Sequence, residues 1–369
     1  MDFEATVEDL VRAIGRAAIV VERKTENVLL TNLKLEVWKT SASGKVVGSS
    51  LIMSAGCRFQ ASVKKEGAVA VDQQRLQSIL SKLPAGKQVR LRQNGEMMEV
   101  RCGSSKYQLN ALGGEDFPRA PKPPTKDILK VRVETLLELI RSTESGMLND
   151  DQRAHLSGAL FDYNSKRAIM VTTDARRLIK YTLPFSGNVE GAIFIPYKAV
   201  LALKKFCETL EMATPIEFVA SNTHVFFWNA VAGFSCRLVE VKKMDYDRAV
   251  PTQLTTKAII QRGKLMDALG RLKVITDGPV RVFADTEADK LEITSANPSA
   301  GTGREVLKGT VKGRDGEIVL SSSHMLEFLA VVRSEKVRLE FTNGDKPALL
   351  QPVKDVDLFA VLLPLVDNR

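Results

Sequence analysis

Cysteine and histidine are scarce in this chain, with four cysteines and three histidines among 369 residues. The cysteines lie far apart and form no C-x-x-C pair, so the sequence indicates neither a zinc knuckle nor a disulfide framework. The histidines are scattered without the spacing of metal ligands. We therefore expect a protein of a reducing compartment, the cytoplasm, that holds no metal.

Long apolar runs are also missing. The longest, Phe359 to Val366, is far too short to cross a bilayer. The first ten residues, MDFEATVEDL, are acidic and lack the apolar core of a signal peptide. The sequence therefore predicts no association with a membrane.

The common motifs of catalysis are absent. The sequence has no GxxxxGK[ST] loop for a nucleotide phosphate and no GxSxG elbow for a serine hydrolase. Gly301-Thr302-Gly303 begins like a dinucleotide fingerprint, but Val306 stands where its third glycine would be. The aspartates at 150–151 and between 285 and 289 do not form a two-metal cluster. We expect no catalytic residue and no bound cofactor; a hydrolase with an unfamiliar site is a remaining alternative.

Positive charge, in contrast, is abundant. The formal net charge is +9 and the pI is ≈ 9.3. This balance favours a polyanionic partner, because lysines and arginines that neutralise phosphates release condensed counterions. A solvated basic surface is the alternative explanation. Apolar residues at 44% and charged residues at 26% are typical of a globular chain, and its length predicts two or three domains.

The most informative pattern is an internal repeat. Three strand-like segments, LIMSAGC, AIMVTTD and LEITSAN, end 117 and 123 residues apart, at Cys57, Asp174 and Asn297. Apolar strands that run into helices end 124 and 125 residues apart, at Val71, Ile195 and Leu320. A period of about 120 residues is a whole domain and far longer than a solenoid repeat. With a proline-rich linker from Pro118 to Pro124 and a second boundary near Pro251, the predicted domains are 1–122, 126–249 and 251–369.

Each repeat contains the same kinds of element. Val7, Leu10 and Ile14 fall on one helical face, and similar stripes recur so that every repeat has two amphipathic helices. Between the helices lie short β-branched runs and turns such as Asn94-Gly95 and Asn343-Gly344, which indicate antiparallel hairpins. The predicted fold class is α+β.

Several motifs, taken in order, resemble the bacterial replicative sliding clamps, the beta subunit of DNA polymerase III. They are GGEDFPRAP from Gly113, DQRAHLSGALF from Asp151, VTTDARRL from Val171, FIPYKAV from Phe194, KLMDAL from Lys264, LEITSANP from Leu291 and VLLPL from Val361. Each motif alone is a weak signal, but their order and spacing along nearly the whole chain are specific. The resemblance implies three repeated clamp domains, each an antiparallel sheet with two helices, that assemble as a ring.

The implied assembly is a head-to-tail homodimer that encircles double-stranded DNA without reading its sequence. The implied partners are the replicative DNA polymerase, which the ring would make processive, a clamp-loader ATPase, repair polymerases and other proteins with a clamp-binding motif. Such a clamp would act in the cytoplasm at the nucleoid. By the resemblance, basic residues of the helices face the DNA: Arg12, Arg16, Lys24, Arg75, Lys82, Arg141, Lys198, Lys205, Arg262 and Arg271. The alternative for each is a solvated surface charge.

The resemblance also implies a groove between the second and third domains that receives partner peptides. Its residues would be Arg153, Leu156, Thr173, Ala175, Arg176, Leu178, Met244, Arg248, Val361, Leu363, Pro364 and Leu365. An apolar depression edged by arginines suits a peptide with apolar anchors and an acidic or polar companion. From hydrophobicity alone, the apolar members would instead be ordinary core residues.

Four further residues occupy the positions at which the family closes its ring: Tyr107, Leu109, Val274 and Ile275. Their alternative is packing inside their own domains. A different class of protein, a sequence-specific DNA-binding regulator, would need a recognition helix in a compact helical domain. The three-fold repeat argues against that class.

Overall fold

The computed structural model describes residues 1–23, 25–241, 245–355 and 357–365. Its contacts divide the chain into two compact units, each built from two segments: Met1–Leu136 with Lys198–Leu238, and Leu137–Tyr197 with Val239–Arg369. Sheets with short helices make up both units, and every strand pair in the described residues is antiparallel. These observations confirm the α+β prediction.

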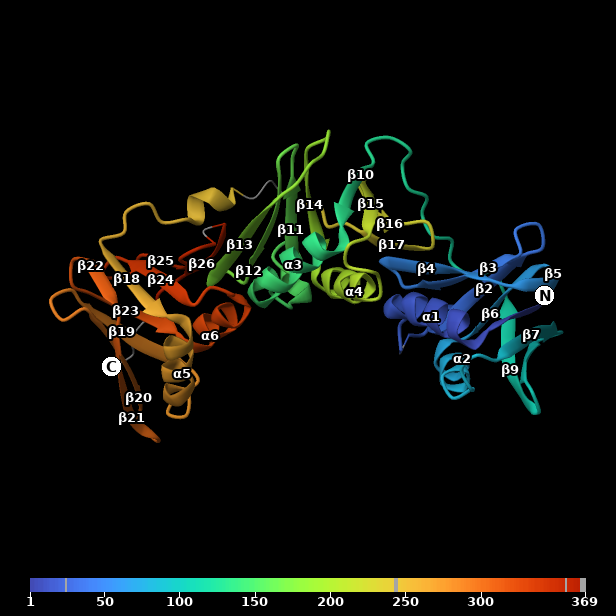
Figure 1. The fold of residues 1–369 in the computed structure, drawn as a ribbon, viewed down its shortest axis with the longest axis horizontal. Helices are drawn as coiled ribbons and strands as arrows, with labels where there is room; N and C mark the ends of the chain where they lie inside the picture. Colours follow the sequence, from blue (N-terminus) through green and yellow to red (C-terminus); the bar gives the residue numbers. More distant parts are fainter. Residues whose placement is uncertain (24, 242–244, 356, 366–369) are drawn as a thin grey trace. The chain divides into compact units, whose positions relative to one another are not determined.

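The first unit holds one continuous sheet, which has 13 strands within the described residues. In spatial order they are β10 (Leu129–Arg132), β15 (Pro215–Ala220), β16 (His224–Trp228), β17 (Ala232–Arg237), β4 (Met53–Gln60), β3 (Ser43–Ser49), β2 (Asn32–Trp38), β6 (Gly67–Asp72), β9 (Ser105–Gly113), β8 (Met97–Cys102), β7 (Gln88–Asn94), β1 (Asp2–Thr6) and β5 (Ser62–Lys65). The helices α1 (Val7–Ala17) and α2 (Gln73–Leu80) pack together, and α1 lies against β3 and β4 (Figure 1).

Local sequence explains where these two helices begin. The Thr6 side chain accepts a hydrogen bond from the Asp9 backbone N–H at 3.2 Å, and Asp72 accepts one from the Arg75 N–H at 2.8 Å. Each cap satisfies a donor that the first helical turn leaves unpaired. The buried positions of α1 include Val7, Leu10 and Ile14, so the predicted apolar stripe faces the sheet.

The second unit holds two sheets. The larger runs in the order β14 (Gly191–Pro196), β11 (Gly158–Tyr163), β12 (Arg167–Thr173), β13 (Arg177–Pro184), β26 (Leu358–Leu362), β25 (Ala348–Pro352), β24 (Lys336–Phe341), β18 (Thr256–Gln261) and β22 (Thr310–Gly313). The smaller runs in the order β21 (Gly301–Lys308), β20 (Lys290–Asn297), β19 (Pro279–Asp285) and β23 (Gly316–Ser321). The helices α5 (Arg262–Leu272) and α6 (Ser322–Val331) pack together within this unit.

A strand followed at once by a helix is the recurring motif of the chain. Each α-helix in the described residues begins at the residue after a strand, including α3 (Val133–Thr143) after β10 and α4 (Tyr197–Glu208) after β14. This arrangement repeats twice within each predicted domain. Two predicted hairpins are also confirmed: Gly95 and Gly344 have positive φ values of 61° and 97° in the turns of β7–β8 and β24–β25.

Two strand pairs explain why the border between the units falls inside the second predicted domain. Ala232–Arg237 (β17) pairs with β4 of the first predicted domain, and β13 pairs with β26 of the third. Each half of residues 126–249 therefore shares a sheet with a neighbouring domain. The division into three domains with the bounds given above stays a prediction.

The alignment of LIMSAGC with the other two segments of the sequence repeat is wrong by one strand. AIMVTTD and LEITSAN lie on β12 and β20, which are middle strands of their β-meanders, whereas LIMSAGC lies on β4, the last strand of its meander. The equivalent middle strand is β3, after which Ser50 follows. Ser50, Asp174 and Asn297 lie 124 and 123 residues apart, a more regular period. Both strands of the β3–β4 hairpin have small polar ends, so the sequence pattern could not distinguish them.

Candidate functional site

The turn between β12 and β13 is the best-defined part of the predicted groove. The Asp174 carboxylate accepts hydrogen bonds from the backbone N–H groups of Arg176 and Arg177, both at 2.9 Å. The Thr173 hydroxyl accepts from the Ala175 N–H at 3.1 Å and donates to the Arg177 carbonyl at 2.6 Å. These bonds hold Ala175 at φ +70°, a left-handed conformation that costs a non-glycine residue about 1 kcal/mol.

The apolar members of the groove lie beside this turn. Leu178 on β13 is directly opposite Val361 on β26, and both belong to a buried cluster. Their exposed fractions are only 6% and 3%, so much of each side chain is core. Tyr246 and Leu254 of the segment that leads to β18 pack against the same cluster, and the Tyr246 hydroxyl donates to Asp162 at 2.8 Å.

The exposed groove residues come from two segments, the β12–β13 turn and the chain after β26. The Leu363 backbone N–H donates to the Arg176 carbonyl at 2.9 Å, which fixes these neighbouring positions. Leu363 is 42% exposed, and the Arg176 side chain is exposed. Pro364 and Leu365 follow, both half-buried, and the Leu365 N–H donates to the Val319 carbonyl at 2.9 Å. An exposed leucine beside an arginine can contact an apolar side chain and an acidic side chain of one peptide.

The remaining predicted groove residues are less closely tied to this edge. Arg153 pairs with Asp150 at 2.8 Å and Arg248 pairs with Asp245 at 2.9 Å. The Arg248 side chain is 87% exposed, and Leu156 is half-buried. Met244 lies outside the described residues. The structure therefore brings together the β12–β13 turn, Leu178, Val361 and the chain after β26.

One buried cation of this region was not predicted. Arg177 is 8% exposed and bonds to Asp174 at 3.0 Å and to Glu327 of α6 at 2.6 Å. It thereby fastens the turn to the helix. His324, also on α6, lies 3.9 Å from Asp174, and its burial, followed by the charge of Arg177, lowers its pKa. The available sequence signal was the pair of arginines in VTTDARRL, since an arginine at the start of a buried strand, such as Arg177 in β13, needs an acidic partner.

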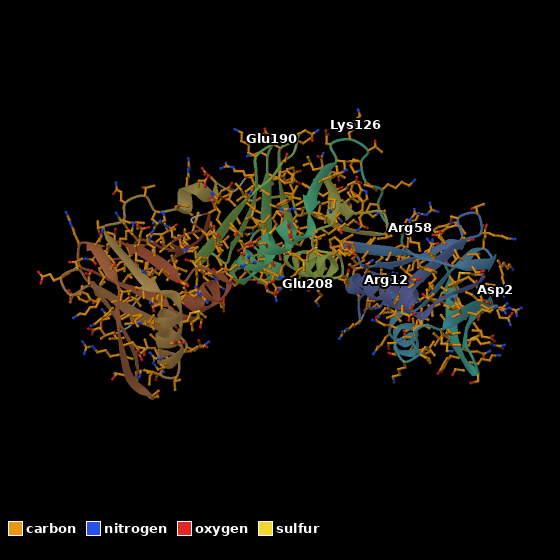
Figure 2. The ribbon with its side chains drawn as sticks, viewed as in Figure 1. Asp2, Arg12, Arg58, Lys126, Glu190 and Glu208 are labelled. Atoms are coloured by element: carbon orange, nitrogen blue, oxygen red, sulfur yellow. The ribbon has the colours of Figure 1, made fainter. Side chains whose placement is uncertain are left out.

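The predicted DNA-facing cations fall into two groups. Those with exposed side chains are Arg12, Arg75, Lys82, Arg141, Lys198, Lys205 and Arg271. Arg12 lies on α1 (Figure 2) and pairs with Asp9. Arg271 forms two bonds with Glu305, at 2.7 and 2.8 Å, so its charge is locally compensated. Lys24 lies outside the described residues.

The other two cations are half-buried and bonded to helix ends. Arg16 donates to the Thr209 carbonyl just beyond α4 at 2.7 Å, and Arg262 donates to the Leu329 carbonyl in the last turn of α6 at 2.9 Å. Backbone carbonyls at helix C-termini lack intrahelical partners and carry partial negative charge. Both arginines therefore satisfy carbonyls at helix ends, and their contact with DNA stays a prediction.

The predicted ring-closing residues lie near two free sheet edges. On β9, only residues 111–113 pair with β6, so residues 105–110 present an unpaired edge among the described residues. Tyr107 on this stretch is 39% exposed, whereas Leu109 is buried. In the second unit, Val274 follows α5 and is 83% exposed, with Ile275 half-buried. The edge strand β21, with Val306 48% exposed, was not predicted to take part.

The described residues carry neither of two features that would indicate another class of protein. They contain no group of three or more His, Cys, Asp or Glu side chains placed to hold a metal ion. They also contain no helix long and apolar enough to span a membrane.

Three family models match the chain in order along its length. The DNA polymerase III beta subunit N-terminal domain matches residues 1–121, the central domain residues 130–243 and the C-terminal domain residues 247–366. The beta sliding clamp of Pseudomonas putida is 26% identical over 99% of this chain and 100% of its own length. That of Escherichia coli K12 is 24% identical over the same shares. These matches confirm the resemblance and the three repeated clamp domains.

Solved structures agree with the fold. The DNA polymerase sliding clamp from Bacillus subtilis matches with a TM-score of 0.93 and 21% identity, over 100% of this chain and 99% of that one. A DNA polymerase III beta-subunit clamp from Pseudomonas aeruginosa bound to griselimycin matches with a TM-score of 0.93 and 24% identity, over 100% of both chains.

Proposed function

Because the chain belongs to the family of DNA polymerase III beta subunits, the bacterial sliding clamps, we propose that it forms a homodimeric ring around duplex DNA and tethers the replicative polymerase. The observation that carries the proposal is the ordered match of all three family domains to nearly the whole chain. The ring acts as a processivity factor without a catalytic site of its own. We assign its domains to residues 1–122, 126–249 and 251–369.

DNA contact is assigned to the basic residues of the helices. Seven predicted cations keep exposed side chains on or next to helices, which supports a surface that meets phosphates without reading bases. Their contribution is non-specific and decreases with added salt, because each neutralised phosphate releases counterions. Arg16 and Arg262 add to the positive electrostatic potential of this surface while they donate to carbonyls at the C-terminal ends of α4 and α6.

Ring closure is assigned to the edges of the two units. An unpaired strand edge is a template for pairing with another chain, and a cyclic dimer with head-to-tail contacts needs two different edges. The stretch 105–110 of β9 with Tyr107 and Leu109 supplies one edge. Val274 and Ile275, together with β21, supply the other.

Partner binding is assigned to the groove beside the β12–β13 turn. Leu178 and Val361 form its floor, and Leu363, Pro364, Arg176 and their predicted neighbours form its edge. Its occupants are peptide segments of the polymerase, the clamp-loader ATPase and repair polymerases. The chain functions in the cytoplasm, at the nucleoid.

A topological experiment tests the function. The protein is loaded by a clamp-loader ATPase onto nicked circular DNA, and its retention is measured by gel filtration before and after one restriction cut. A clamp stays on the circle and is lost from the linear product. Equal retention on both forms would contradict the proposal; retention that follows a particular sequence would instead support a regulator, and conversion of the DNA an enzyme.

A further inference from the structure

A small cavity lies in the first unit where β4 pairs with β17, with a volume of ≈ 150 Å³. The Cys57 thiol of β4 accepts a hydrogen bond from Arg16 of α1 at 3.5 Å, so Cys57 faces the helix. Successive strand residues point to opposite faces. Gly56 and Arg58 therefore face away from α1; Figure 2 labels Arg58 and Arg12 of these two elements.

Two glycines form the floor of this cavity. Gly56 and Gly233 are register partners on β4 and β17, so two adjacent strands lack a side chain at the same point. Beside them, Trp228 is the register partner of Gly233, and Val47 is the register partner of Gly56. Pro121 closes a further side, and its fixed φ makes that wall stiff. The cavity therefore lies between the two glycine-bearing strands and the proline-rich linker.

Two cations beside the cavity form no ion pair within the described residues, although the register partner of Lys45 on β2 is Glu36, which pairs with Lys34 at 3.7 Å. Lys45 lines it, with its side chain next to Gly56, and the Lys45 ammonium group makes no hydrogen bond or ion pair within the described part of the chain. Its register partner Arg58 makes no side-chain ion pair there either. Burial, followed by the charge of Arg58, lowers the pKa of Lys45, and the opposing charge of Glu36 only partly offsets these effects. A carboxylate placed against both cations would relieve this repulsion.

We propose that this cavity docks a short acidic segment of a partner protein, which places one phenylalanine or leucine side chain over Gly233, beside the Lys45 side chain that covers Gly56, and a carboxylate against Lys45 and Arg58. Its volume suits one large side chain, since an apolar cavity of about 150 Å³ in another protein binds benzene. The β4–β17 pair occupies the place in its repeat that β13–β26 occupies in the next. The site is separate from the groove assigned above and stands on its own residues.

Tryptophan fluorescence gives a local readout of binding. The chain has two tryptophans, so Trp38→Phe leaves Trp228 in the cavity wall as the only one. The probe is the heptapeptide Gly-Ser-Gly-Phe-Asp-Gly-Ser, titrated into this full-length variant. We expect a saturable change in fluorescence with a dissociation constant on the order of 1 mM or tighter. Matched peptides with alanine for phenylalanine, or asparagine for aspartate, bind at least about tenfold more weakly.

Two substitutions in the same background locate the site. Gly233→Val fills the floor, and it is compatible with the fold because a Cβ there would lie 3.5 Å from Trp228 and β-branched residues suit strands. It abolishes binding. Lys45→Gln weakens binding about tenfold through loss of a charged hydrogen bond. The control Lys130→Gln, on an exposed lysine of β10, leaves the affinity unchanged, as does Leu363→Ala at the groove.

Three results would overturn the proposal: no saturable response, equal binding of the asparagine peptide, or unchanged affinity in Gly233→Val. If Gly233→Val does not fold, Lys45→Gln decides, and an unchanged affinity in that variant would also overturn it. Failure of this site leaves retention on DNA circles unaffected, so the two proposals are tested separately.

Discussion

Substitutions of Leu178 and Leu363 can distinguish a role in core packing from a role in peptide binding, because both residues belong to the proposed groove but differ in burial. Leu178 is 6% exposed in the core cluster, so Leu178→Ala creates a cavity and lowers the free energy of unfolding by about 2–5 kcal/mol. Leu363 is 42% exposed, and Leu363→Ala costs about 1 kcal/mol. For a unit of this size, each kcal/mol lowers the melting temperature by about 2–4 °C.

Two assays on the same samples distinguish the roles. Calorimetry should give a melting temperature for Leu363→Ala within a few degrees of the unmodified protein and a clearly lower one for Leu178→Ala. Fluorescence anisotropy with a labelled clamp-motif peptide should show a loss of affinity of about tenfold or more in Leu363→Ala. Full peptide affinity in Leu363→Ala would refute the assignment of this edge, and equal melting of the two variants would refute the burial argument.

Two further predictions concern titrating groups. All four cysteines are buried, and burial raises the pKa of Cys207 and of Cys236 to about 12. The folded protein should therefore not react with a thiol reagent such as dithionitrobenzoate, whereas the urea-unfolded chain should react at all four cysteines and release four equivalents of the chromophore. Rapid labelling of the folded protein would contradict this prediction. His324 has a lowered pKa in the fold, so below about pH 6.5 the unfolded chain binds a proton that the folded chain resists, and the free energy of unfolding falls. In urea melts, His324→Asn should lose less stability than the unmodified protein between about pH 7.5 and 5.5, and parallel losses would argue against the shift.

The helices, the hairpins and their repetition along the chain could be predicted from local patterns in the sequence. The stripe of Val7, Leu10 and Ile14 predicted α1, and the Asn-Gly pairs predicted two hairpins, because both signals are local. The alignment of LIMSAGC was wrong by one strand, since β3 and β4 have similar small polar ends and only their pairing distinguishes them.

Contacts between segments far apart in the chain could not be predicted from the sequence. Arg177 reaches Glu327 across 150 positions, and Arg16 reaches Thr209 across 193, so neither partner follows from local spacing. Composition predicted that basic side chains would be available, but not that Arg271 would be compensated by Glu305. The family motifs indicated the groove, yet the burial of Leu178 depends on strand pairing with β26.

The most direct test of a clamp is the shape and mass of the purified particle. Electron microscopy combined with light scattering should show a closed ring of two chains, each of 40.6 kDa, around a hole wide enough for a DNA double helix. A solid particle, or a strictly monomeric species at micromolar concentration, would contradict the account.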